Sequence, residues 1–168
     1  RMLAKISHRG PDDEGVWQCN GGRTLLGQRR LAIIDLSPGG HQPMVSTDGR
    51  YAITFNGEIY NYNELKLELK KLGWSFRTKS DTEVLLNSYI QWGEACLEKL
   101  NGMFAFAIWD EKEKKLFAAR DRFGIKPLCY TDNAEGLFIA SEAKALFAMG
   151  IKAAWDEYSF FHAASLQY

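Results

Sequence analysis

The chain has no excess of either charge. Its 168 residues include 21 lysines and arginines against 21 aspartates and glutamates, so the formal net charge is zero. A strongly basic face that would attract nucleic acid or an anionic membrane is therefore not expected. A small or neutral partner fits this composition better.

Long apolar runs and paired cysteines are also missing. The longest apolar run is Met103 to Trp109, whereas a helix needs about 20 apolar residues to cross a bilayer, and nothing resembles a signal peptide. The three cysteines, Cys19, Cys96 and Cys129, form no C-x-x-C pair and leave one over. This argues against a disulfide framework and against a thiolate metal site. We therefore expect a soluble protein of the reducing cytoplasm, without a membrane partner or a metal.

The sequence contains no internal repeat, low-complexity tract or interior linker. Its length suits one domain with a sizeable core and is too short for two. The tail, residues 151–168, differs from the rest because its aromatic residues Tyr158, Phe160 and Phe161 follow no clear period. We expect this tail to dock on something outside the chain.

The first third of the sequence predicts a helix end and then strands. Residues 1–6 are expected to end a helix, and residues 16–19 and 24–28 to pair as an antiparallel hairpin around Asn20-Gly21-Gly22. A further strand-like apolar run covers residues 31–34.

The middle of the sequence predicts a strand at residues 51–55 and then a helix that Asn63 caps and Gly73 ends. The apolar residues of this helix recur at helical spacing: Leu65, Leu69 and Leu72. A short strand is expected at residues 74–78.

A second helix has clear signals at both ends. Ser80 to Glu83 has the S-x-x-E form of a capping box, and Gly93 follows the apolar run 84–92. Four strands are expected after it, at residues 103–110, 116–120, 128–131 and 137–140, and then a short helix at 142–149. Residues 103–109 are apolar on both strand faces, which predicts a central strand covered on each side. Antiparallel sheets layered between helices are implied.

The stretch Phe55-Asn56-Gly57-Glu58 is the strongest local candidate for a site, placed where the strand 51–55 is expected to end. An asparagine amide and a glycine N–H can converge on an oxyanion, while a neighbouring glutamate can hold an amine. Asn-Gly is also a common tight-turn dipeptide. A plain hairpin or loop therefore stays open as an alternative.

Several ordered blocks together resemble a known family. They are residues 8–15 (HRGPDDEG), 29–35 (RRLAIID), 40–44 (GHQPM), 55–62 (FNGEIYNY), 80–84 (SDTEV), 100–110 (LNGMFAFAIWD), 119–128 (ARDRFGIKPL) and 140–146 (ASEAKAL). This pattern resembles the glutamine amidotransferase domain of glutamine-hydrolysing asparagine synthetases, from Met2 to about Leu146.

The resemblance implies an α+β, N-terminal-nucleophile hydrolase fold. This is a four-layer αββα sandwich of two antiparallel sheets between helices, here with its first strand missing. It also implies that glutamine is hydrolysed to glutamate and ammonia. The ammonia would reach a second, synthetase domain, absent here, that uses ATP and Mg²⁺ to amidate aspartate.

At the carboxylate end of glutamine, the resemblance implies that Arg30 grips the α-carboxylate, which suits a bidentate guanidinium. Backbone groups at Leu31 and Ile33 are implied as further substrate contacts. From the residues alone, a surface or structural ion pair is the preferred interpretation of Arg30.

At the reacting and amine ends, Asn56 and Gly57 match the oxyanion hole, and Glu58 and Asp81 match the acids that receive the α-ammonium. Asp81 has a competing interpretation, because an acid in the first turn of a helix is favoured by the helix dipole alone. His8 and His41 lie in glycine and proline loops and are not expected to be catalytic.

The nucleophile of this family is a cysteine at the mature N-terminus, activated by its own amine. We expect it about 15–20 residues upstream of Arg1, so the chain alone is predicted to be inactive. Cys19, Cys96 and Cys129 are expected to be structural thiols. Gln28 stands where many relatives have histidine.

The expected organisation is a glutaminase domain at residues 1–150 and, at 151–168, the start of a connection to the synthetase domain. No cofactor is expected in the glutaminase domain. The expected partners are L-glutamine and the synthetase domain, with a homodimer left open. Two alternatives remain at this point: a non-catalytic binding or scaffolding module, and an amidotransferase for another acceptor. The segment Arg120 to Arg122 is expected to be structural.

Overall fold

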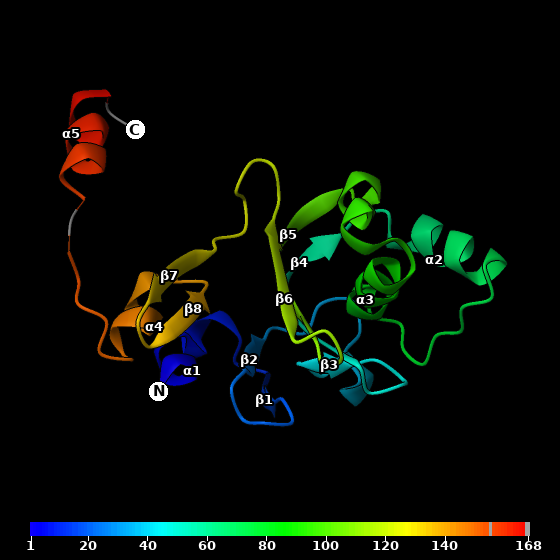
Figure 1. The fold of residues 1–168 in the computed structure, drawn as a ribbon. Helices are drawn as coiled ribbons and strands as arrows, with labels where there is room; N and C mark the ends of the chain where they lie inside the picture. Colours follow the sequence, from blue (N-terminus) through cyan, green and yellow to red (C-terminus); the bar gives the residue numbers. More distant parts are fainter. Residues whose placement is uncertain (155, 167–168) are drawn as a thin grey trace.

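The computed structural model describes residues 1–154 and 156–166. Two layers of antiparallel strands lie between two layers of helices, and Figure 1 shows these four layers edge-on. This arrangement confirms the predicted αββα sandwich. Within the described residues, no helix is both long and apolar enough to cross a membrane.

The central sheet has the strand order β3-β4-β5-β6, with antiparallel pairing throughout. Its strands are β3 (Met44–Val45), β4 (Tyr51–Ile59), β5 (Gly102–Asp110) and β6 (Lys115–Arg120). Strand β5 is buried from Phe104 to Asp110, which confirms the central strand that its two apolar faces predict.

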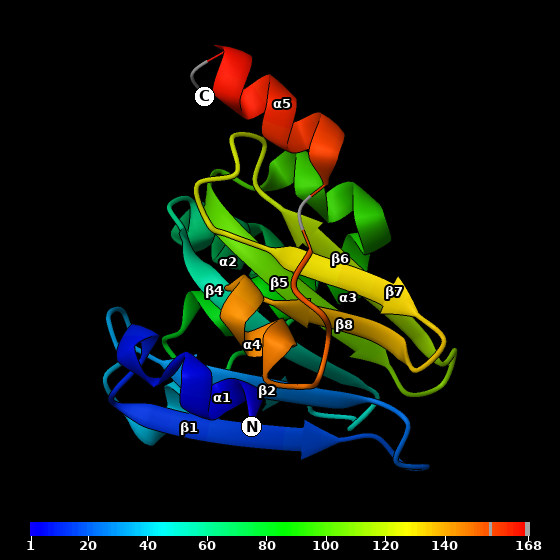
Figure 2. The ribbon, with the colours of Figure 1, turned by 90° about the vertical axis from the view of Figure 1, so that its left-hand side faces the viewer.

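The outer β layer consists of two hairpins, which Figure 2 shows beside each other. One is β1 (Asp13–Gln18) with β2 (Leu25–Arg30), and the other is β7 (Cys129–Asn133) with β8 (Gly136–Ala140). Both were predicted, although β1 begins three residues early and β2 continues to Arg30. That continuation carries Arg30 to the end of a paired strand, opposite Asp13.

Helices α2 (Tyr62–Lys71) and α3 (Asp81–Trp92) cover the outer face of the central sheet, and the 3₁₀ segment Gly93–Lys99 follows α3. The main core lies between them and the sheet, and it contains Ile53, Ile59, Leu69, Val84, Leu85, Leu86 and Phe106. A smaller core of Cys19, Leu26, Ala52 and Trp109 lies between the two β layers. The other helical layer holds α1 (Met2–Lys5) and α4 (Ala143–Phe147).

Two predicted strands are wrong. Residues 31–34 belong to no strand, with a bend at residues 33 and 34, and the side chains of Leu31 and Ile33 are exposed, because this segment leaves the end of β2 without a partner strand. Residues 74–78 also lie outside any strand. There the backbone N–H groups of Arg77 and Thr78 donate to the Glu83 carboxylate instead of to a neighbouring strand.

The predicted cap of α2 is also wrong. The helix begins at Tyr62, and the N-cap residue is Asn61 rather than Asn63. The Asn61 side chain joins the helix to the start of β5, since it donates to the Lys99 carbonyl at 2.9 Å and accepts from Asn101 N–H at 3.0 Å. Gly73, with φ +95°, follows the helix as predicted.

Strand β4 does not end at Phe55, and Asn56-Gly57 is not a turn. The strand continues to Ile59, paired with β5 as far as Gly102. At Gly57, an added Cβ would collide with the carbonyl oxygen of Met103 and lie 2.8 Å from the Cα of Phe104. The glycine therefore permits close approach of two strands rather than a reversal of the chain.

The tail contains a helix, α5 (Glu157–Leu166), where the sequence showed no clear period. It lies apart from the four layers in Figure 1, and the side chains of Tyr158, Phe160 and Phe161 are exposed. Positions 155, 167 and 168 of the tail lie outside the described residues.

Candidate functional site

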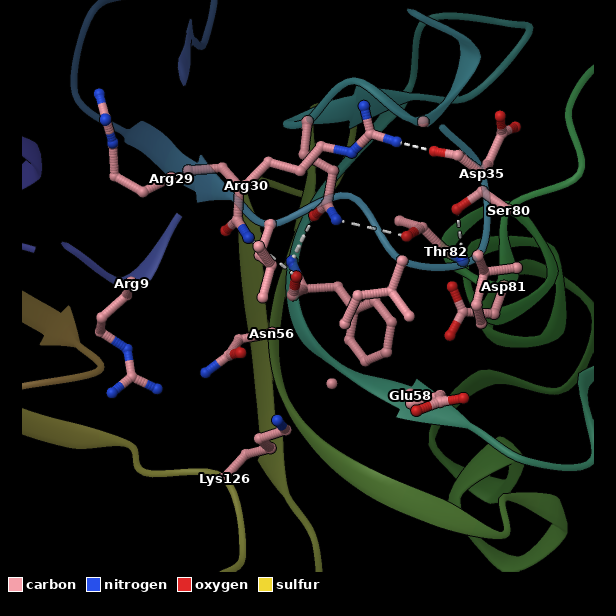
Figure 3. A pocket seen from close by; sticks show the side chains of 18 of the residues that line it. Arg9, Arg29, Arg30, Asp35, Asn56, Glu58, Ser80, Asp81, Thr82 and Lys126 are labelled. Carbon is pink, nitrogen blue, oxygen red and sulfur yellow. Dashed lines mark hydrogen bonds between the residues drawn. The ribbon is translucent and has the colours of Figure 1, made fainter. Parts of the chain in front are cut away.

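A cavity of about 400 Å³ brings together all seven residues that the sequence analysis assigned to a site. Strand β2 and the segment after it contribute Arg30, Leu31 and Ile33; β4 contributes Asn56, Gly57 and Glu58; and α3 contributes Asp81. Figure 3 shows Arg30, Asn56, Glu58 and Asp81 around this cavity.

The backbone of β4 directs alternate peptide groups to its two edges. At its ends, Arg50 accepts through its carbonyl from Glu111 N–H (2.8 Å), and Tyr60 N–H donates to the Asn101 carbonyl (2.7 Å). Even-numbered residues therefore point their peptide groups toward β5. Odd-numbered residues, including Gly57, point theirs to the opposite edge.

Side chains occupy that opposite edge on both sides of Gly57. Phe55 N–H donates to Gln42 Oε1 at 2.7 Å, and the Phe55 carbonyl accepts from Gln28 Nε2 at 3.0 Å. Further along, Ile59 N–H donates to Asp81 Oδ2 at 3.0 Å. Gly57 lies between these bonds and lines the cavity. Its N–H thus faces the cavity as a backbone donor.

Asn56 supplies a second donor. Its Nδ2 is buried and has no hydrogen-bond partner among the described residues, and Figure 3 shows the side chain pointing into the cavity. A buried, unsatisfied donor costs about 1–3 kcal/mol. Such a donor is available to an acceptor on a ligand.

Asp81 and Glu58 form the acidic side of the cavity. Asp81 is only 5% exposed, and burial raises the pKa of its carboxyl, an effect that the Glu58 carboxylate reinforces and the N–H groups of Ile59 and Thr82 oppose. Neither acid has a cationic side-chain partner among the described residues. The pair can receive a cationic group of a ligand.

Only the Ser80 half of the predicted capping box before α3 forms. Ser80 is the N-cap, and its side chain accepts from Thr82 N–H at 3.1 Å. Glu83 does not reach back to Ser80. Its buried carboxylate instead accepts from Arg77 N–H (2.9 Å), Thr78 N–H (2.7 Å) and the Thr78 hydroxyl (2.8 Å). These bonds fix the segment that leads into Asp81.

The Arg30 guanidinium has no carboxylate partner among the described residues, so the structural ion pair considered for it is not formed. It donates to two backbone carbonyls, of Asp35 and of Ser37 at 3.3 Å. A Cβ at Gly40 would collide with this guanidinium. The segment 31–40 therefore wraps around Arg30 and holds it at the rim of the cavity.

Two glutamines that the sequence analysis did not assign to the site support β4. Gln42 is buried, and besides holding Phe55 N–H its Nε2 donates to Thr82 Oγ1 at 3.3 Å. Gln28 bridges the two β layers, because it also accepts from Thr54 Oγ1 at 2.6 Å. The block GHQP pointed to Gln42 in the sequence, but not to its contact with β4.

The other candidate groups lie elsewhere or are engaged. No cysteine is among the described residues that line the cavity; Cys19 and Cys96 are buried, and burial raises the pKa of Cys96 to about 11. His8 lines the cavity but lies 3.0 Å from Glu142 Oε1, and His41 lies 2.7 Å from Asp13 Oδ2. The described residues contain no group of three or more His, Cys, Asp or Glu that could hold a metal ion.

Known proteins share both the sequence and the fold. The chain is 50% identical over 150 residues to glutamine-hydrolysing asparagine synthetase 3 of Bacillus subtilis (strain 168), an alignment that covers 88% of this chain and 24% of that protein. It is 41% identical over 153 residues to amidase chry2 of Gibberella zeae, with 91% and 23% covered. The chain thus spans about a quarter of the length of these curated relatives.

A solved structure has the same architecture. It is the glutamine phosphoribosylpyrophosphate amidotransferase of B. subtilis complexed with ADP and GMP, with a TM-score of 0.75 and 25% identity over 89% of this chain and 40% of that chain. This likeness agrees with the predicted N-terminal-nucleophile hydrolase fold. Residues 1–167 match the family described as a glutamine amidotransferase domain. Since this match spans nearly the whole chain and agrees with the layered fold, the chain belongs to the glutamine amidotransferase domain family.

Proposed function

We propose that this chain is the glutaminase domain of a glutamine-hydrolysing asparagine synthetase. The observation that carries the proposal is the unpartnered Nδ2 of Asn56 beside the cavity-facing N–H of Gly57. Two donors next to each other suit an oxygen that gains negative charge during acyl transfer. The acids Glu58 and Asp81 on another side of the cavity make an α-amino acid amide the best substrate class.

Glutamine would be held at three points. Glu58 and Asp81 would receive its α-ammonium, and Arg30, with backbone groups at Leu31 and Ile33, would receive its α-carboxylate. The side-chain amide oxygen would then reach Asn56 and Gly57. Contacts with the α-ammonium, the α-carboxylate and the side-chain amide together would fix both the chirality and the length of the substrate. This accounts for selectivity toward glutamine.

The reaction would proceed by covalent catalysis. A cysteine thiolate, whose proton passes to the terminal amine, adds to the amide carbon of glutamine, and the carbonyl electron pair moves to the oxygen. Asn56 Nδ2 and Gly57 N–H stabilise this oxyanion. The terminal ammonium then returns this proton to the amide nitrogen, and collapse of the intermediate re-forms the carbonyl and breaks the C–N bond, so that ammonia leaves. Water then cleaves the thioester to release glutamate. The cysteine, expected upstream of Arg1, stays a prediction.

In the whole protein, the ammonia would pass to a synthetase domain that amidates aspartate with ATP and Mg²⁺. The asparagine synthetase relative supports this arrangement, since this chain covers only 24% of it. Residues 151–168 would begin the connection to that domain. ATP and Mg²⁺ belong to the synthetase domain and none of the described residues is assigned to them. A cytoplasmic location and a homodimer remain part of the proposal.

Turnover of glutamine by the full-length gene product tests this function, with glutamate and ammonia as the measured products. We expect Asn56→Ala to lower kcat by about 100- to 1,000-fold with KM nearly unchanged, because one oxyanion donor is lost. Asn20→Ala, in the exposed turn of the first hairpin, is the matched control and should leave kcat unchanged. Equal turnover by Asn56→Ala and wild type would refute the assignment. Glutamine binding without any turnover by wild type would identify a non-catalytic module.

A second candidate is an amidotransferase for another acceptor. It is favoured by the 41% identity to a relative named as an amidase. Because the acceptor would bind outside this domain, both candidates share the glutaminase step. Formation of asparagine from aspartate, glutamine and ATP by the full-length protein would select the first candidate, and glutamine turnover without asparagine would select the second.

A further inference from the structure

An unpaired ammonium group faces the same cavity. Lys126 lines it, on the loop between β6 and β7, and Figure 3 shows its side chain extending into the cavity near Asn56. Its Nζ makes no hydrogen bond or ion pair with any described residue. In the same view Glu58 and Asp81 lie apart from it. The Lys126 ammonium is therefore not paired with the acids of the cavity.

The backbone of Lys126 is anchored on both sides. The buried Asp121 carboxylate accepts from Lys126 N–H at 3.0 Å, and also from Ile125 N–H at 2.9 Å and Phe104 N–H of β5 at 3.1 Å. Arg120 Nε donates to the Lys126 carbonyl at 2.7 Å. The loop is thus fixed to the central sheet, so the lysine extends from a rigid base.

The other cationic side chains around the cavity already donate hydrogen bonds. Arg9 pairs with Glu142 at 3.0 Å, Arg29 pairs with Glu14, and Arg30 donates to backbone carbonyls. Among the described residues that line the cavity, Arg30 and Lys126 are the cations without a carboxylate partner, and Lys126 is the one whose side chain makes no hydrogen bond. A free ammonium that lines the same cavity as a buried, free amide donor marks a part of the cavity that favours negative charge.

We propose that Lys126 is a further catalytic residue, whose ammonium stabilises the oxyanion of the tetrahedral intermediate together with Asn56 Nδ2 and Gly57 N–H. This proposal rests on the proposed glutaminase function. A charged donor forms a hydrogen bond roughly twice as strong as a neutral donor does. It strengthens most when the carbonyl oxygen becomes anionic, so its contribution falls on the transition state rather than on bound glutamine.

The test compares Lys126→Met with Lys126→Arg in the full-length protein, using glutamine hydrolysis as the readout. We expect Lys126→Met to lower kcat by about 10- to 100-fold with KM within about twofold, since a transition-state interaction is lost. Lys126→Arg keeps the charge and should recover most of kcat. Lys112→Met, at an exposed position in the turn after β5, is the matched control and should match wild type.

Two outcomes would overturn the proposal. They are an unchanged kcat in Lys126→Met, whether or not KM rises, and equal losses of kcat in Lys126→Met and Lys126→Arg. The second would show that the side chain acts through packing rather than charge. Inactivity of wild type would instead overturn the proposed glutaminase function and this inference with it, so the two failures are distinguishable. Melting temperatures of all variants identify any loss caused by unfolding.

Discussion

Two side chains around the cavity bury a polar group that lacks a complementary partner among the described residues. Asn56 buries a donor without an acceptor, and Asp81 buries a carboxylate without a cation among the described residues. Each costs the folded protein free energy that a complementary ligand group would restore. These two missing partners predict a ligand that offers an acceptor to Asn56 and a cationic group to Asp81.

Asp81→Asn should change how stability depends on pH. Burial raises the pKa of Asp81 above its ordinary value of 3.8, so between 3.8 and the raised value the native state binds more protons than the unfolded chain. Stability linked to this group is complete below 3.8 and is lost as pH rises through the raised pKa. We expect the variant to gain stability relative to wild type across this window. Denaturant unfolding at a series of pH values measures the difference.

The same substitution should weaken glutamine binding in the full-length protein. Losing a charged partner of the ammonium predicts about 10- to 100-fold weaker binding at neutral pH. Wild-type affinity should rise with pH as Asp81 ionises, and the variant should lack this rise. Parallel stability curves for the two proteins, or equal affinities by calorimetry, would contradict the role of Asp81.

Helix α3 is positioned by the segment before it rather than by its own apolar face alone. Ser80 caps the first turn, and Glu83 binds the backbone of residues 77 and 78. Together these bonds place Asp81 at the cavity while Val84 and Leu85 pack in the core. The element that carries a substrate-binding residue is therefore fixed at its N-terminus by polar groups.

Glu83→Ala should destabilise the protein by about 2–3 kcal/mol, because it leaves the N–H groups of Arg77 and Thr78 without their acceptor. Glu64→Ala provides the control, since Glu64 is an exposed acid in the first turn of α2 and should cost less than about 0.5 kcal/mol. Urea denaturation of the three proteins measures the losses. Similar values for both variants would show that the Glu83 bonds contribute little.

The two β layers meet across polar as well as apolar contacts. Gln28 of β2 donates to the Phe55 carbonyl and accepts from Thr54, both of β4, beside the small core around Trp109. A polar bridge between the layers fixes their relative position, since apolar contacts are not directional. The cavity depends on this relative position because β2 and β4 each contribute part of its lining.

Gln28→Ala should cost about 1–3 kcal/mol, since it leaves the Phe55 carbonyl unsatisfied between the layers. Gln18→Ala removes only a 3.4 Å bond to the Gly22 carbonyl at the exposed end of β1 and should change stability by less than about 0.5 kcal/mol. Thermal and urea unfolding compare the two. If Gln28→Ala unfolds like wild type, apolar packing alone sets the relative position of the two layers.

The sequence predicted elements best where a local signal was strong. The β1–β2 hairpin, the two-faced apolar strand β5 and helix α3 with its Ser80 cap all form as expected. The predictions failed where the conformation of a segment depends on partners outside that segment. Residues 74–78 had the pattern of a strand but are bound by Glu83, and Asn56-Gly57 had the pattern of a turn but lies within a strand paired with β5.

The ordered motifs of the sequence were enough to indicate the family and seven residues that line the cavity, and the periodicity of its apolar residues agreed with the layered fold. Which groups in the cavity are unpaired became clear only from the folded structure. Whether Asn56 Nδ2 finds an acceptor, whether Gly57 N–H faces β5 or the open edge, and whether Lys126 finds an acid all depend on residues far apart in the sequence. Hydrogen bonding is short-ranged and directional, so packing of the layers settles it and sequence patterns do not.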